Sequence, residues 1–94
     1  MIASHLESSL TLLQKAFPKG ISEEEYFTLL DLLYEDFSDR NLAELISYFH
    51  KKEYSEVMND IYSSQSTKKP LKQSVNTLKE RMKPFGYDEW KQEE

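Results

Sequence analysis

Residues 21–37 read ISEEEYFTLLDLLYEDF, a capped and strongly apolar segment with polar sequence on both sides. Ser22 and Glu25 have the spacing of a capping box, and three consecutive glutamates suit the positive end of a helix. At 100° per residue, the apolar side chains from Tyr26 to Tyr34 span an arc of about 220°. Such an arc is too wide for one neighbour, so we expect this helix to be buried at the centre of the fold. Its solvent-facing side is predicted to consist of Glu24, Thr28, Asp31 and Glu35.

Four further helices are predicted before and after this segment, at residues 4–17, 39–50, 54–62 and 71–83. Each is inferred from apolar residues at helical spacing, and the helices at 4–17, 39–50 and 71–83 also have a start or stop signal. Ser4 and Ser38 are expected to cap the helices at residues 4–17 and 39–50, and the Pro18-Lys19-Gly20 break ends the helix at 4–17. Leu6, Leu10, Leu13 and Phe17 form the apolar stripe of the first helix, and Leu71, Val75, Leu78 and Met82 form that of the last.

The sequence therefore predicts an all-α, compact single-domain bundle of about five helices, with the second helix central and buried. The domain is expected to cover residues 1–90, with Tyr87 and Trp90 docked on the bundle and residues 91–94 frayed. No β-rich alternating run, internal repeat or sustained heptad series argues for another class.

Charge is distributed unevenly along the chain. Residues 1–65 carry 12 acids and 5 bases, residues 66–83 carry 1 acid and 6 bases, and residues 84–94 carry 4 acids and 1 base. An acidic body opposes nucleic-acid binding by the whole domain, because neutralising phosphates requires clustered cations. Only residues 66–83 offer such a cluster.

The absence of cysteine excludes disulfides, thiolate metal sites and a cysteine nucleophile. Residues 1–7 lack the basic and long apolar regions of a signal peptide, and no run approaches the roughly 18 apolar residues of a membrane span. We therefore expect a cytoplasmic protein without a membrane partner.

Motifs for catalysis or cofactor binding are missing from the sequence. His5 and His50 are far apart, and neither has a second histidine at the i+3 or i+4 spacing of a helical metal site. Residues 36–44 faintly suggest a calcium loop but lack its glycine and its bidentate glutamate. No serine lies in a nucleophile elbow, and no glycine-rich loop could cradle a phosphate. We expect no enzyme activity, no metal and no cofactor.

A basic strip on the predicted fifth helix is the sharpest candidate for a contact site. Three of its lysines fall within about 40° of one another, and two more lie at the N-terminus of that helix, where an anion is favoured. The alternative interpretation is that these lysines are merely solvated, because a narrow apolar seam leaves most of the helix in water. The residues of the strip are Lys68, Lys69, Lys72, Asn76, Lys79 and Lys83.

A second candidate is a set of tyrosines at the margins of the apolar stripes, namely Tyr34, Tyr48 and Tyr62. A tyrosine there packs its ring while its hydroxyl stays in water, an arrangement that suits protein contacts. Ordinary packing at the rim of a core is the alternative interpretation.

Several of these segments resemble a family of short all-helical bacterial domains of unknown function, well represented in mycobacteria. The likeness is carried by residues 16–26 (AFPKGISEEEY), Leu29-Leu30 and residues 37–39 (FSD), with later landmarks at Asp60-Ile61, Pro70, Val75 and Gly86. It extends from about Leu10 to Trp90. This chain departs from the pattern at Gly86-Tyr87, where the family tends to have Gly-Trp, and in its lysine-rich loop. The resemblance implies a compact helical bundle and supplies no catalytic residues.

Taken together, these features favour a non-catalytic protein-interaction module that binds another protein or a second copy of itself. The alternative is binding of a nucleic acid or a phosphate ligand through the basic fifth helix and the loop before it.

Overall fold

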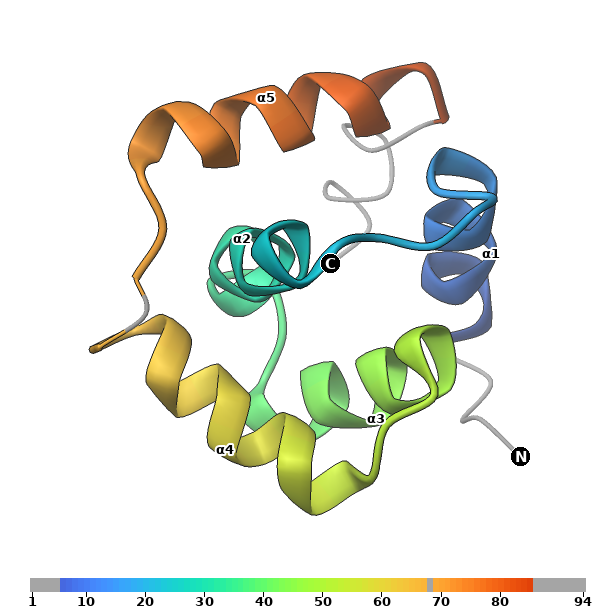
Figure 1. The fold of residues 1–94 in the computed structure, drawn as a ribbon. Helices are drawn as coiled ribbons and strands as arrows, with labels where there is room; N and C mark the ends of the chain where they lie inside the picture. The colour runs from blue at the N-terminus through green and yellow to red at the C-terminus, as the bar shows by residue number, and fades with distance from the viewer. Residues whose placement is uncertain (1–5, 68, 86–94) are drawn as a thin grey trace.

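The computed structural model describes residues 6–67 and 69–85, which contain five α-helices (Figure 1). The helices are Glu7–Ala16 (α1), Glu23–Tyr34 (α2), Asp39–His50 (α3), Tyr54–Ser64 (α4) and Lys72–Met82 (α5), and a short 3-10 helix follows at Lys83–Phe85 (η2). No strand occurs in these two ranges. The predicted all-α bundle of five helices is confirmed.

Helix α2 lies in the middle of the bundle and packs against α3, α4 and α5 (Figure 1). Its start is fixed by a capping box. Ser22 Oγ accepts a hydrogen bond from the Glu25 backbone N–H at 3.2 Å, and Glu25 Oε1 accepts one from the Ser22 N–H at 2.9 Å. These bonds satisfy two backbone donors that a helix start would leave unpaired. Since Leu29, Leu30 and Leu33 are fully buried, the prediction of a central second helix is confirmed.

One apolar core receives side chains from all five α-helices of the described residues. Leu13 of α1, Ile46 of α3, Ile61 of α4 and Met82 of α5 are all completely buried around the leucines of α2. A shared core of this kind is what makes a small domain fold as one unit.

Two residues with positive φ turn the chain between helices. Gly20, with φ of 81°, follows the proline that ends α1, as the sequence predicts. Lys51, with φ of 55° and ψ of 47°, ends α3 in the left-handed conformation that glycine usually supplies at this place. The turn at Lys51 reverses the chain so that α4 packs back against α3.

Two expectations about α2 and α5 are wrong. Thr28, predicted to lie on the solvent-facing side of α2, is covered by α5 and only 3% exposed, and Asp31 is partly buried, whereas Glu24 and Glu35 on the same side are exposed as predicted. Once α3 and α4 occupy the apolar sides of α2, the polar side is the one left for α5 to pack on. Leu71, predicted to join the apolar seam of α5, is 75% exposed. It precedes the helix in extended conformation, so it does not follow the helical spacing of Leu78 and Met82, which are buried.

One predicted helix boundary differs from the structure, and several predictions concern residues that the structure does not describe. Helix α4 continues to Ser64, two residues beyond its predicted end. The predictions for Ser4, Lys68, Tyr87, Trp90 and the tail 91–94 fall outside the described residues. Within the described ranges, none of the helices has both the length and the apolar character needed to cross a membrane.

Candidate binding groove between α2 and α5

Three hollows lie along the contact between α2 and α5, with volumes of about 210, 300 and 320 Å³. The first two share Glu24, Thr28 and Ser74, so they adjoin, and we refer to them together as the groove. The third contains much of the predicted basic strip, and we refer to it as the lysine hollow. The side chains that line the groove are Glu24, Glu25, Phe27, Thr28, Lys69, Pro70, Leu71, Ser74, Thr77, Leu78 and Arg81.

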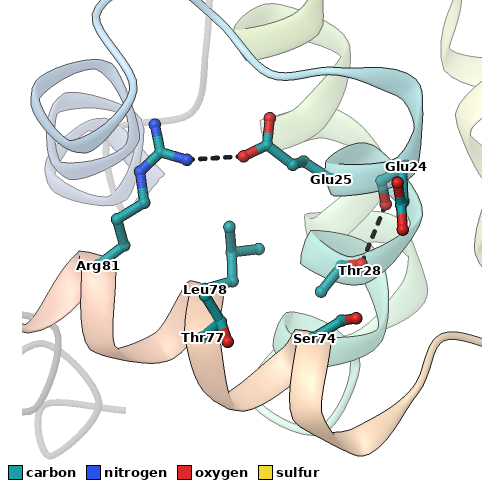
Figure 2. Close-up of a pocket in the computed structure, with 7 residues that line it drawn as sticks. All are labelled: Glu24, Glu25, Thr28, Ser74, Thr77, Leu78 and Arg81. Carbon is teal, nitrogen blue, oxygen red and sulfur yellow. Dashed lines mark hydrogen bonds and ion pairs between the residues drawn. The ribbon is translucent and has the colours of Figure 1, made fainter.

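One end of the groove is closed by an ion pair between α2 and α5. Figure 2 shows Arg81 of α5 reaching toward Glu25 of α2, with 2.6 Å between Nη1 and Oε2. The guanidinium also lies 4.7 Å from the ring centroid of Phe17, a cation–π contact that holds it in place. The hydrogen bonds that Glu25 accepts from Ser22, and then the contact with Arg81, lower the pKa of Glu25. Both charges at this end are therefore satisfied within the chain.

The middle of the groove is lined by small hydroxyl side chains and by Leu78 (Figure 2). Thr28 Oγ1 donates to the Glu24 carbonyl and Thr77 Oγ1 to the Gln73 carbonyl, both at 3.0 Å. Leu78, 4% exposed, lies between the two helices. Because each threonine proton is used within its own helix, the threonine oxygens can only accept further hydrogen bonds.

The other end of the groove is apolar and open. It is formed by Phe27, which packs against the core, and by Pro70 and the exposed Leu71. Lys69 lines this end, and its ammonium pairs with Asp31 Oδ1 at 3.2 Å.

The structure brings together only part of the predicted basic strip. Lys69, Lys72, Asn76 and Lys79 surround the lysine hollow, whereas Lys83 lies beyond it and pairs with Glu80 at 3.0 Å. Two carboxylates, Asp31 of α2 and Glu35 directly after it, line the same hollow, and Gln65 also donates to Asp31 at 2.8 Å. Three lysines therefore share the space with two acids, which weakens the site for an anion.

The three candidate tyrosines are not gathered at these hollows. Tyr34 on α2 is partly buried against the core, as the alternative interpretation of ordinary rim packing expects. Tyr48 on α3 and Tyr62 on α4 are 40% and 53% exposed. No hydrogen bond or ring contact joins the three tyrosines within the described residues, so the structure offers no combined aromatic site there.

A polar cluster that sequence reasoning missed joins α2 to α3 and α4. Tyr26 donates its hydroxyl to Asp60 Oδ2 at 2.7 Å, and Lys52 pairs with the same oxygen at 3.0 Å. His50 stacks on the Tyr26 ring at 4.8 Å, and the Lys52 ammonium lies 4.5 Å from that ring. Burial, and then the hydrogen bond to Asp60, raise the pKa of Tyr26 above its usual range, whereas burial and nearby Lys52 lower that of His50. No signal in the local sequence marks this pairing, because Tyr26 and Asp60 are 34 positions apart.

This cluster is better described as part of the scaffold than as a reactive site. Tyr26 is 1% exposed, and its hydroxyl proton is already donated to Asp60. Across residues 6–67 and 69–85, no three His, Asp or Glu side chains are grouped so as to hold a metal ion.

The fold and the groove define this chain as an all-α five-helix bundle with an open groove between its central and last helices. No protein-family model, no curated protein and no solved structure matches the chain. Its resemblance to the mycobacterial family therefore stays a prediction, and the functional argument rests on the groove.

Proposed function

We propose that this chain is a non-catalytic protein-interaction module that binds its partner in the groove between α2 and α5. The observation that carries the proposal is the groove itself, where apolar side chains and hydroxyl groups are exposed in a shaped hollow between two helices. The proposal includes a location in the bacterial cytoplasm, which the lack of cysteine and the family resemblance support.

The openness of the groove, and not its size, favours side chains of a protein over a small molecule. Its two adjoining hollows, of about 210 and 300 Å³, together have a volume within the roughly 300–1,000 Å³ typical of small-molecule pockets, but such pockets enclose most of their ligand. Each hollow is open to solvent and suits one or two side chains of an extended segment.

A pair of matched variants tests this proposal. Ser74 belongs to both hollows and is half-buried, so Ser74→Tyr should fill the groove, whereas Ser55→Tyr places the same group on the exposed side of α4. Wild type and S55Y should capture the same proteins from a lysate of the cells that make this chain, and S74Y should lose them. Thermal unfolding checks that both variants stay folded. Capture that survives in S74Y, or no capture combined with a monomer by light scattering, would contradict the proposal.

The lysine hollow supports a second candidate, binding of a nucleic acid or a phosphate ligand. The ammonium groups of Lys72 and Lys79 form no ion pair within the described part of the chain, and they share the hollow with Asn76. If both contact phosphates of duplex DNA, log K should fall against log salt with a slope of about −1.8, and K72A/K79A should abolish binding. Equal binding of DNA, RNA and nucleotides by wild type and the double variant would exclude this candidate.

A further inference from the structure

The charges around the groove are not equally satisfied. Arg81 is paired with Glu25 at 2.6 Å, and Lys69 is paired with Asp31 at 3.2 Å. Glu24, by contrast, lines both hollows, is exposed, and forms no ion pair with any residue of the described ranges. The charge that the groove leaves available to a partner is therefore negative.

Two of the three hydroxyl groups in the groove have the same preference, whereas the Ser74 hydroxyl can both donate and accept. The hydroxyl protons of Thr28 and Thr77 are donated to carbonyls of their own helices, so these side chains offer only acceptors. Glu24 is also an acceptor. A partner that brings hydrogen-bond donors, such as an ammonium or a guanidinium, satisfies these groups, whereas a carboxylate or a phosphate does not.

The apolar part of the groove adds a second requirement. Leu71 is 75% exposed and faces the same hollow as Phe27 and Pro70. A side chain of leucine or phenylalanine size that enters this hollow removes apolar surface from water on both partners. Because Glu24 lines the same hollow, the apolar and the cationic groups of a partner must be close together in its sequence.

We infer that the groove binds an extended segment of a partner protein with a leucine or phenylalanine next to a lysine or arginine. The apolar side chain packs against Leu71, and the cation pairs with Glu24. The inference rests on the proposed function and adds the chemistry of the partner. Residues 84–94 of this chain carry 4 acids and 1 base, a charge opposite to the one that Glu24 would attract.

A phage-displayed library of random dodecapeptides tests the inference even though the partner is unidentified. Sequences selected on the wild-type chain should be enriched in leucine or phenylalanine beside lysine or arginine, and S74Y should select none of them. A library selected on Glu24→Lys should lose its basic residues. No enrichment, enrichment of acidic or purely polar sequences, or the same sequences on S74Y would overturn the inference.

Titration of one selected peptide then assigns the two contacts. Glu24→Lys should weaken binding about tenfold or more and flatten its dependence on salt. Leu71→Ala should weaken it about fivefold to tenfold without changing that dependence. Glu7→Lys, which reverses a charge in the first turn of α1, is the matched control for E24K, and S55Y is the control for S74Y. Equal affinities for E24K and E7K would overturn the assignment of Glu24.

The results separate this inference from the proposed function. If S74Y loses the captured proteins while the selected peptides are acidic or polar, the groove is a binding site and only the partner chemistry is wrong. If capture is the same in wild type and S74Y, the proposed function itself fails. The emission maximum of Trp90, the one tryptophan of the chain, should be the same in wild type and S74Y. A shift would place this chain's own C-terminal residues in the groove and overturn the inference.

Discussion

Helix α2 meets its neighbours in two very different ways. Toward α3 and α4 it presents Tyr26, Leu30 and Leu33, none of them more than 1% exposed. Toward α5 it presents residues with the same i, i+4, i+7 spacing, shifted by two positions and therefore by about 200° around the helix. These are Glu24, Thr28 and Asp31, and the contact they make leaves hollows of about 210–320 Å³.

The difference shows how one helix can pack tightly on one side and leave an open groove on the other. The contact of α2 with α3 and α4 is tightly packed, because burying its leucines and its aromatic ring removes apolar surface from water. Carboxylates and ammonium groups cannot be packed in the same way, because removing their hydration costs more than their pairing returns. The α5 side therefore stays partly hydrated and open, and a binding site there does not weaken the main core.

We call the side of α2 that faces α3 and α4 its closed side. The largest effect on stability should come from shortening a side chain there. Leu33→Ala removes a fully buried leucine and should lower the free energy of unfolding by about 2–5 kcal/mol. Val75→Ala removes a partly exposed side chain beside the lysine hollow and should cost less than about 1 kcal/mol. Urea unfolding of both variants measures the two values. Similar losses would show that the two contacts of α2 are equally tight.

A smaller effect should follow from removing one hydroxyl in the polar cluster. Tyr26→Phe deletes the hydrogen bond to Asp60 and should cost about 1.5–3 kcal/mol, since the acceptor is charged and partly buried. Tyr62→Phe makes the same change on a side chain that is 53% exposed and should alter stability by less than about 0.5 kcal/mol. If Y26F were as stable as Y62F, the Tyr26–Asp60 bond would not help to hold α2 against α4.

The closed side of α2 is the part of the molecule that the sequence predicts best. The Ser22–Glu25 capping box and the wide apolar arc are both local patterns, so they identify the start of α2 and its central place whatever helices surround it. The Pro18–Gly20 break and the Ser38 cap are predictable for the same reason.

The groove is the part that the sequence predicts least. Lys69 looks like a free cation in the sequence, but Asp31, 38 positions away, neutralises it. No local pattern groups Arg81 with Glu25, because the two are 56 positions apart. Helical periodicity also assigns Thr28 to solvent, since nothing nearby in the sequence shows that α5 will cover it. Contacts between distant segments decide the charge of the site, and helical periodicity carries no information about them.

Replacing the left-handed lysine that joins α3 to α4 should stabilise the closed side. Lys51→Gly relieves the cost of φ at 55° and should raise the free energy of unfolding by about 0.5–1 kcal/mol, despite the greater freedom of glycine in the unfolded chain. Lys51→Ala keeps that cost and serves as the control for the lost side chain. A gain in both variants would assign the effect to the lysine side chain instead of the backbone.

The smallest expected effects on stability depend on pH. They differ between the side of α2 that faces α3 and α4 and the side that faces α5. The lowered pKa of His50 means that the fold favours its neutral form, so its contribution to stability is complete above the unfolded value of about 6.5. That contribution should be lost as the pH falls below 6.5. The lowered pKa of Glu25 gives a second contribution, at the Arg81 end of the groove, that is lost only as the pH falls below the unfolded value of about 4.5.

Urea unfolding between pH 4 and 8 of wild type, His50→Gln and Glu25→Gln separates the two contributions. The difference between wild type and H50Q should shrink as the pH falls below 6.5, while the difference between wild type and E25Q should hold until the pH is below 4.5. The sign for His50 depends on a balance, because burial and Lys52 oppose its protonation whereas Asp60 favours it. A difference between wild type and H50Q that grows on acidification would mean that the attraction to Asp60 prevails. His50 would then bind a proton more tightly in the folded chain than in the unfolded chain. Its contribution to the free energy of unfolding would increase in acid, whereas that of the Glu25–Arg81 pair would decrease.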